Sequence, residues 1–344
     1  MCTKRRGKEG TGMNQSISVI QYGLGPIGQA IVRDLTRKKT IRITGAIDID
    51  AEKVGKDLGD LVGLSSPMGV RVSDDSRAVL SGESAQLVVL STVSSIEACY
   101  PQIEEVIESR KHLISTCEEL AYPWLTHPDL ARKIDDFAKD RNVAVLGTGV
   151  NPGFLMDYLP VVVSGVCREI SRIRVFRIQD ASFRRVPFQR KIGAGLTKDE
   201  FEKKRRDKQI RHVGLTESIH MIARGLGWEI DHTEEEIFPV LAEKPVESTS
   251  IKVAPGDAKG MRQVGRGLKN GQELIALEMA MTLGQDNPRD VIEIDGTPKT
   301  RLVFEGGVHG DIATAAVVVN AIPQLFRVTP GLKTMLDMPP VRFY

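Results

Sequence analysis

The glycine-rich segment "GLGPIG" constrains this chain most, because it lies between a short β-branched run and a helical pattern. The run begins at Ile17, and Gly23, Gly25 and Gly28 complete a GxGxxG spacing. In that motif the first glycine permits a tight turn, the second lets a pyrophosphate reach the backbone, and the third lets helix and strand pack closely. Pro26 stands near the expected helix start, where its missing N–H costs nothing. The segment therefore predicts a dinucleotide site at a helix N-terminus.

A second strand pattern, "RITGAIDID", follows that helix and ends near Asp48. A carboxylate at this spacing hydrogen bonds ribose hydroxyls and repels a 2′-phosphate, so we expect NAD as the cofactor. Lys53 lies near enough to keep NADP as an alternative. Alternatively, Asp48 is an ordinary turn residue at the end of a strand.

Strand and helix patterns alternate without interruption from this motif to about residue 154. Such alternation predicts an α/β fold of the Rossmann type, a doubly wound parallel sheet with helices on both faces. The segments are strand-like at 85–92, 112–119 and 143–154, and helical at 96–111 and 127–142.

Ligands bind such sheets beyond the carboxyl ends of the strands, so polar residues at those ends are candidates for the site. Glu118 and Glu119 close one strand pattern, and Thr92 and Asn151 close two others. The predicted cofactor-binding residues are Gly23, Gly25, Pro26, Ile27, Gly28, Asp48, Ser91, Thr92, Thr116 and Asn151.

The pattern changes after about residue 155. "ISRIRVFRIQDA" alternates apolar with basic residues, which is typical of a strand buried on one face of a mixed or antiparallel sheet. The apolar segment 310–326 predicts a buried helix with Asp311 as its N-cap. We therefore predict a disordered tail at 1–15, a Rossmann domain at 16–154, a second α+β domain at 155–308, and a C-terminal helix and tail at 309–344 that return to the Rossmann domain.

Composition limits the partners of the chain. With 47 Lys and Arg against 45 Asp and Glu, the net charge is too small to predict binding to nucleic acid or to a membrane surface. The basic N-terminus is followed by no long apolar segment, which argues against a secretory signal or membrane anchor. The four scattered cysteines, without CxxC spacing, indicate neither a disulfide framework nor a metal site, and they favour the cytoplasm.

Charged residues of the second domain have competing interpretations. The basic stretch 182–215 is typical of a solvated helix face, with an anion-binding lid as the alternative. His212 and His309 could each bind substrate or complete a loop. Glu217 and His220 are expected on a solvated helix surface.

Six longer motifs carry a family resemblance that extends from about Ile17 to Tyr344. The chain resembles the 2,4-diaminopentanoate dehydrogenases and the related native amine dehydrogenases, which share a dihydrodipicolinate-reductase-like architecture. The motifs are "GLGPIG", "STCEELAYPW", "GTGVNPGF", "KIGAGLTKDEF", "HVGLTESIHMIARGLGW" and "VHGDIATAAVVVNAIPQL". The resemblance implies an NAD(P)-dependent enzyme that converts an amine to a ketone or aldehyde plus ammonia, reversibly. It also implies a homodimer formed through the second domain.

In such a family, a carboxylate before the NPGF motif handles the amine. Successive strand residues face opposite sides, so only one of the two acids is expected to reach the substrate. Glu119 is the first candidate and Glu118 the second. The resemblance and composition suggest these substrate-binding residues: Asn151, Pro152, Phe154, Met156, Phe176 and His309.

Two other functions stay open at this point. A carbonyl or cyclic-imine reductase of the dihydrodipicolinate reductase type would share the fold, and a non-catalytic NAD(P)-binding sensor would share the glycine motif. The substrate is open too. A diamino acid would need an inward-facing cation such as Arg174, Arg177 or Arg184, whereas a simple ketone or aldehyde would need an apolar wall.

Overall fold

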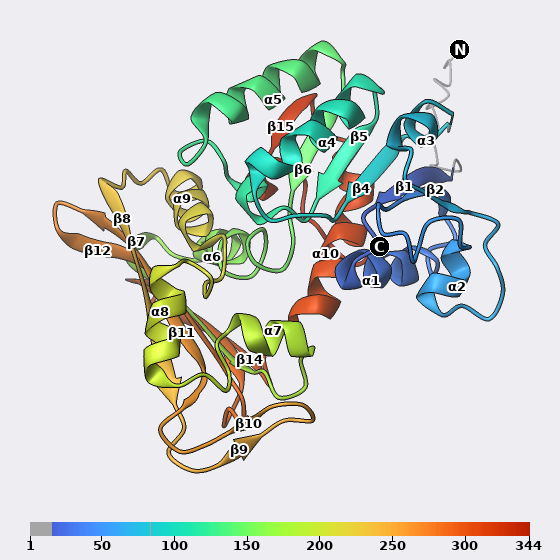
Figure 1. Cartoon of the computed structure of the whole chain (residues 1–344). Coiled ribbons are helices and arrows are strands. Elements are labelled where there is room, and N and C mark those ends of the chain that lie inside the picture. The colour runs from blue at the N-terminus through green and yellow to red at the C-terminus, as the bar shows by residue number, and fades with distance from the viewer. Residues whose placement is uncertain (1–15, 83) are drawn as a thin grey trace, which may run out of the picture.

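The computed structural model of the protein describes residues 16–82 and 84–344, so the expected tail at 1–15 lies outside the described residues. The fold is built on two large β-sheets (Figure 1). Helices α6 (Tyr158–Ser164) and α9 (Leu215–Leu226) lie between these sheets. Within the described ranges, no helix is both long and apolar enough to cross a membrane.

The first sheet has seven strands in the order β15-β6-β5-β4-β1-β2-β3, all paired in parallel. Chain order reverses between β1 and its neighbour β4, which opens a crevice for ligands at their carboxyl ends. The predicted doubly wound sheet is therefore confirmed. Its strands are β1 (Ile17–Tyr22), β2 (Ile41–Ile47), β3 (Val72–Ser73), β4 (Leu87–Leu90), β5 (His112–Ser115), β6 (Ala144–Gly147) and β15 (Gly331–Lys333).

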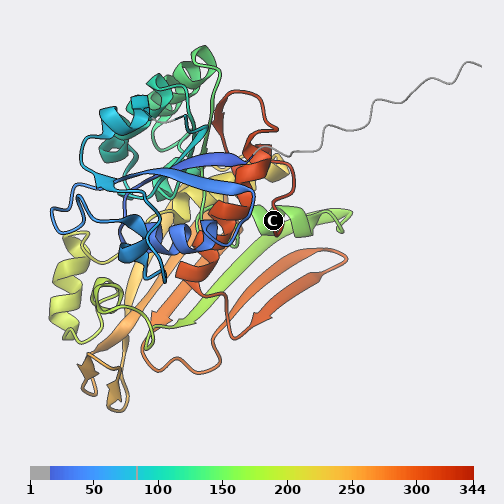
Figure 2. The ribbon, with the colours of Figure 1, turned by 90° about the vertical axis from the view of Figure 1, so that its right-hand side faces the viewer.

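Helices cover both faces of this sheet, because each presents an apolar stripe to it. Ile31 of α1 and Val318 of α10 share one buried cluster, and Ile103 of α4 and Ile134 of α5 share the other. Figure 2 shows α10 beside α1, with the C-terminus near both. The helices are α1 (Pro26–Leu35), α2 (Leu58–Val62), α3 (Ser76–Gly82), α4 (Ile96–Glu108), α5 (Pro128–Asp140) and α10 (Gly310–Leu325).

The second sheet has six strands in the order β14-β13-β7-β12-β11-β8, and only β7 and β12 pair in parallel. It is therefore mixed, as expected. Its strands are β7 (Glu169–Asp180), β8 (His232–Leu241), β11 (Ala258–Lys269), β12 (Gln272–Thr282), β13 (Arg289–Thr297) and β14 (Thr300–Glu305). Helices α7 (Val186–Lys191) and α8 (Lys198–Arg206) follow β7, and β9 (Val246–Glu247) pairs with β10 (Lys252–Val253).

Alternation along β7 decides which side chains reach the space between the sheets. Val175 and Arg177 are buried on the face that packs against α9. Arg174 and Phe176 point to the opposite face, where Arg174 lies 3.1 Å from Glu293. Of the three candidate arginines, Arg174 therefore faces away from the space between the sheets.

Two local expectations need correction. The strand pattern at 112–119 ends at Ser115, and Glu118 and Glu119 begin a short 3-10 helix, η1 (Glu118–Ala121). Strand alternation therefore does not separate the two acids. Helix α10 is capped by His309, whose side chain accepts a hydrogen bond from Ile312 N, so Asp311 lies in the first turn and is not the N-cap.

Candidate active site

A cavity of about 400 Å³, hereafter the main cavity, opens beyond the carboxyl ends of the parallel strands and is closed by the second sheet. Strand β5 and η1 bring Glu118 to one wall, and β7 brings Arg177 to the other. The first-sheet wall is formed by residues 25–27, 91–94, 116–118 and 148–152. Seven of the predicted cofactor residues line the cavity, namely Gly25, Pro26, Ile27, Ser91, Thr92, Thr116 and Asn151.

The glycines of the loop have two different roles: Gly23 and Gly28 allow close packing, and Gly25 leaves room for a ligand. A Cβ on Gly28 would lie 2.1 Å from the Gly23 carbonyl oxygen, and a Cβ on Gly23 would lie 2.4 Å from the Ser91 carbonyl oxygen. A Cβ on Gly25 would have no atom within 4 Å. Gly25 is also the N-cap of α1 and makes no side-chain cap, so the first amides of the helix are left for a phosphate. The loop therefore fits a dinucleotide pyrophosphate.

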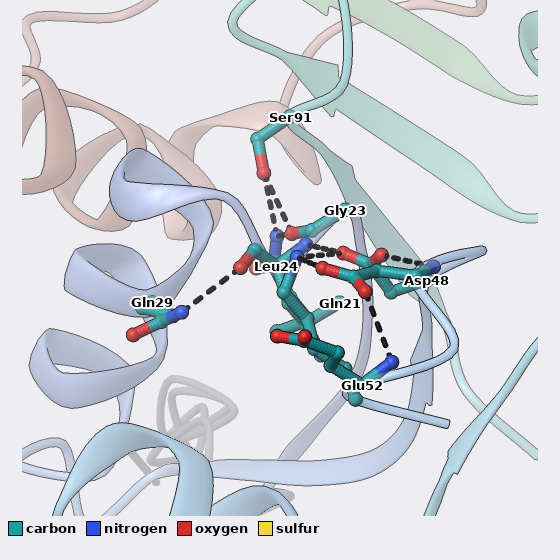
Figure 3. Close-up of polar contacts among 9 residues, drawn as sticks. Gln21, Gly23, Leu24, Gln29, Asp48, Glu52 and Ser91 are labelled. Atoms are coloured by element: carbon teal, nitrogen blue, oxygen red, sulfur yellow. Dashed lines mark hydrogen bonds and ion pairs between the residues drawn. The ribbon is translucent and has the colours of Figure 1, made fainter. Parts of the chain in front are cut away.

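Asp48 holds this loop in place from the end of β2 (Figure 3). Its Oδ2 accepts a hydrogen bond of 2.6 Å from Leu24 N, and its Oδ1 accepts one of 2.9 Å from Asp50 N. Lys53 Nζ lies 3.3 Å from Asp48 and 3.0 Å from Asp50. Gly23, Gly28 and Asp48 thus shape the loop without lining the main cavity.

Only one of the two predicted acids faces the main cavity. Glu118 lines it, and burial raises the pKa of this carboxyl, while a hydrogen bond from Ser94 and the charge of Lys191 oppose the rise. Glu119 instead accepts a hydrogen bond of 2.9 Å from Ile96 N at the start of α4. The Glu119 carboxylate also lies 3.9 Å from Arg211. The first candidate acid is thus turned away from the cavity, and the second lies in it.

Four side chains of the main cavity wall present buried polar atoms that have no hydrogen-bond partner in the described protein. They are Thr148 Oγ1, Asn151 Oδ1, Arg184 Nε and His212 Nδ1. Because leaving such an atom unpaired costs about 1–3 kcal/mol, the cavity wall carries polar groups that the described protein atoms do not satisfy.

The second-domain wall is strongly basic. Arg177, Arg184, Arg185 and Lys191 line it and are named here the cationic wall. Arg177 is fully paired, with its Nε 2.9 Å from Asp290 and an Nη2 bond of 2.8 Å to Val308 O. The other two arginines, Arg184 and Arg185, both pair with Asp311, at 2.8 and 3.4 Å. Lys191, at the end of α7, has no ion-pair partner in the described part of the chain.

Several expected substrate residues lie elsewhere. Asn151 and Pro152 line the main cavity, but Phe154 packs on Tyr158 with ring centroids 5.9 Å apart. Met156 is fully buried in the core of the second sheet, and Phe176 is on its outer face. On the second-domain side, the apolar part of the cavity wall is instead formed by Pro187, Phe188, Met279 and Met281. His309 caps α10 and does not line the cavity.

Glu217 was expected on a solvated surface, but the side chain is buried, with only 5% exposed. Burial, together with the neighbouring carboxylates of Glu119 and Glu235, raises its pKa to about 7. His220 of the same helix is half-buried. Helix α9 is enclosed by η1 on one side and by β11 and β12 on the other, which a single amphipathic pattern does not reveal.

The sequence analysis singled out none of Gln179, Met279 and Met281, and it included Lys191 only within the basic stretch 182–215; all four reach the cavity through the tertiary arrangement. Strand parity alone would have placed Gln179 beside Arg177. Among the residues that the structure describes, no group of three or more His, Cys, Asp or Glu side chains is arranged to hold a metal ion.

Comparison with known proteins identifies the family. A family model described as the 2,4-diaminopentanoate dehydrogenase C-terminal domain matches residues 154–343. The 2,4-diaminopentanoate dehydrogenase of Acetoanaerobium sticklandii is 31% identical and covers 94% of each chain. The amine dehydrogenase of Streptomyces virginiae is 26% identical, over 94% of this chain and 96% of its own.

A solved structure agrees with these sequence matches. The amine dehydrogenase from Mycobacterium smegmatis has a TM-score of 0.85 and 25% identity to this chain, covering 96% of it and 98% of its own length. The resemblance inferred from the six motifs is confirmed, and it weighs against the reductase and sensor alternatives. The chain belongs to the 2,4-diaminopentanoate dehydrogenase family and is an NAD(P)-dependent oxidoreductase that acts on CH–NH2 donors.

Proposed function

We propose that this enzyme deaminates an amino acid that carries the reacting amine on its side chain, of the type of 2,4-diaminopentanoate. One observation carries the proposal: the main cavity has a carboxylate, Glu118, on the first-sheet wall and an incompletely neutralised cationic wall opposite. A substrate with an ammonium group at one end and a carboxylate at the other matches this charge arrangement. The curated relative that is 31% identical is named for such a compound.

Glu118 is the residue that we assign to the amine. Its carboxylate accepts hydrogen bonds from the substrate ammonium, takes the proton that the nitrogen loses, and then holds the water that replaces the nitrogen. The raised pKa of Glu118 brings its proton affinity closer to that needed for proton transfer near neutral pH. When bound, the nicotinamide accepts the hydride from the carbon that carries the amine.

The cofactor would lie along the first-sheet wall. We assign the pyrophosphate to the amides at the start of α1, beside Gly25, and the nicotinamide amide to the stretch of the wall that holds Thr148 and Asn151. NAD is the preferred form, because a 2′-phosphate would approach the carboxylates of Asp48 and Asp50, and Lys53 alone offsets them.

The deciding experiment compares 2,4-diaminopentanoate with pentane-2,4-diamine, which lacks only the carboxylate, using NAD+ and NADP+ in turn. We expect NADH formation together with release of one ammonia per turnover, and a kcat/KM at least about 10-fold higher for the amino acid. Equal kcat/KM for the two amines would refute a carboxylate-binding cationic wall. Cofactor reduction without ammonia would refute deamination.

We further infer that the enzyme is a cytoplasmic homodimer. The outer face of the second sheet combines Phe176 and the 40%-exposed Phe238 with charged pairs such as Arg262–Glu278. Such a mixture of aromatic and paired charged groups suits a subunit interface. Light scattering should give twice the chain mass, and a monomer at micromolar concentration would contradict the inference. The free cysteines of the described chain, Cys99, Cys117 and Cys167, favour a reducing compartment.

A further inference from the structure

Gln263 and His212 form a contact that extends the active site into the second sheet. We propose that Gln263 is a positioning residue that presents His212 to the main cavity as a fixed, uncharged hydrogen-bonding group for the substrate carboxylate. The proposal rests on the proposed function, because it concerns how the far end of that substrate is held.

The side chain of Gln263 hydrogen bonds to both the backbone N–H and the backbone carbonyl of His212. The Gln263 side chain is fully buried on β11; its Oε1 accepts a hydrogen bond of 2.7 Å from His212 N, and its Nε2 donates one of 2.8 Å to His212 O. The same Nε2 donates to Glu235 Oε1 at 3.0 Å. These three contacts fix the orientation of the amide. In a flipped amide, the NH2 group would face the N–H of His212, so that two donors would meet. The side chain thus pairs with the loop as a neighbouring strand would.

The loop is fixed on its other side by the first domain. A Cβ on Gly214 would lie 2.5 Å from Pro152 Cδ, so this glycine packs directly on the cavity wall at Pro152. Gly214 also has a φ of 112°, which disfavours any other residue. His212, two residues earlier, is therefore held between β11 and the first-domain wall, with little freedom to retreat from the cavity.

The imidazole of His212 is kept neutral in this position. Burial, together with the charges of Lys191, Arg177 and Arg184, lowers the pKa of His212 to about 3. Its Nδ1 is enclosed by protein atoms and has no partner among the described residues. A neutral imidazole carries one N–H donor and one acceptor nitrogen, and the tautomer with hydrogen on Nε2 can donate to an anion in the cavity that His212 lines.

Surrounding charge determines which ligand group suits His212. Lys191, His212 and Glu118 all line the main cavity, and the charge of Lys191 lowers the pKa of both His212 and Glu118. An ammonium group beside His212 would be repelled by the cationic wall, whereas a carboxylate would be attracted. Lys191 then supplies charge and His212 supplies a directed hydrogen bond. Because His212 stays neutral, it adds no positive charge to oppose the amine at Glu118.

The test uses two variants and two substrates. Gln263→Met keeps the length of the side chain and removes its hydrogen bonds, and His212→Phe removes the ring nitrogens within the cavity itself. KM and kcat are measured for 2,4-diaminopentanoate and for pentane-2,4-diamine. We expect each variant to raise KM for the amino acid about 10-fold, with kcat and the KM for the diamine within about twofold of wild type.

The double variant identifies the positioning role. If Gln263 acts through His212, the double variant should be no worse than His212→Phe alone. Gln324→Met, a matched change at a buried glutamine of α10, should leave the ratio of the two KM values unchanged. Equal losses with both substrates would show a purely structural role for Gln263. Additive losses in the double variant would show that Gln263 acts independently of His212, which would also overturn the proposal.

Failure of this inference is distinguishable from failure of the proposed function. A wild-type enzyme that does not prefer the amino acid overturns the carboxylate assignment and the inference together. A wild-type preference that survives both Gln263→Met and His212→Phe overturns the inference alone. Should Gln263→Met fail to fold, His212→Phe still decides whether the imidazole binds the carboxylate.

Discussion

Glu118 and Glu119 are adjacent in the chain, yet their carboxylates reach different surroundings. Glu118 lines the main cavity, whereas Glu119 accepts the Ile96 amide at 2.9 Å behind the cavity wall. The 3-10 helix η1 produces this separation, because each residue of such a helix turns by about 120° from the one before. The two acids therefore have separable roles.

Glu118→Gln should remove most of the turnover. The amide keeps the shape of the side chain but neither takes a proton nor attracts an ammonium group, and loss of a general acid-base group typically costs about 100-fold to 10,000-fold in rate. Steady-state kcat with NAD+ and the amino acid measures the effect, and a fluorescence titration with NADH should show unchanged cofactor affinity. Activity within threefold of wild type would remove Glu118 from the chemistry.

The matched control is Glu119→Gln, one residue away. Glutamine keeps an oxygen that can accept the Ile96 amide, so we expect kcat within about threefold of wild type and a loss of stability of about 1 kcal/mol from the weakened contact with Arg211. An inactive but folded Glu119→Gln beside an active Glu118→Gln would reverse our assignment of the amine-handling residue.

The glycine loop offers a pair of alanine variants with opposite outcomes. Gly25 has φ −63° and ψ 178°, which alanine adopts freely, and its added methyl meets open space where we assign the pyrophosphate. Gly25→Ala should therefore keep the thermal midpoint and weaken NADH binding by at least about 10-fold. Gly28→Ala should destabilise the fold by about 1–3 kcal/mol, because its Cβ would lie 2.1 Å from the Gly23 oxygen. Unchanged NADH affinity in Gly25→Ala would place the pyrophosphate elsewhere.

Asp48 should set the cofactor preference. Asp48→Asn keeps an acceptor for the Leu24 amide and removes one of the two carboxylates that surround Lys53. We expect wild type to favour NADH over NADPH by at least about 10-fold in Kd, and the variant to narrow that ratio by about 10-fold through tighter NADPH binding. A ratio that stays constant would show that Asp48 acts only as a loop anchor.

Much of the first domain follows from local pattern. Buried apolar runs such as Leu87–Leu90 alternate with amphipathic helices, and the glycine spacing fixes which strand meets a helix N-terminus. Local pattern does not reveal edge strand β8, because "HTEEEIFPVL" is polar and largely exposed at the margin of its sheet. Edge strands need little apolar surface, so hydrophobic periodicity detects them poorly.

The candidate site was predictable only where a strand end carries it. Gly25, Ser91, Thr92 and Asn151 reach the main cavity for this reason. The cationic wall depends on the packing of a second sheet against the first, a long-range arrangement that no local pattern encodes. Lys191 is one of many exposed basic residues between 182 and 215, and only the fold distinguishes it from the solvated lysines of α8.

Glu217 makes the stability of the enzyme depend on pH in an unusual direction. Its pKa of about 7 in the folded protein exceeds the ordinary value of 4.5 expected when the chain is unfolded. The folded state therefore binds the proton more tightly, so this contribution to stability is complete below pH 4.5 and is lost as the pH rises through 7. The difference of about 2.5 pKa units corresponds to about 3 kcal/mol at pH 8.

Glu217→Gln should remove this penalty, because glutamine resembles the protonated acid in shape and never ionises. We expect the variant to be more stable than wild type at pH 8, and its advantage to be roughly 2 kcal/mol smaller at pH 5, where wild-type Glu217 is already protonated. Urea unfolding of both proteins at the two pH values measures the difference. Glu243→Gln, at an exposed acid, serves as the control and should show no such pH dependence. An equal effect of Glu217→Gln at both pH values would mean that Glu217 has an ordinary pKa, and that the carboxylates of Glu119 and Glu235 do not raise it.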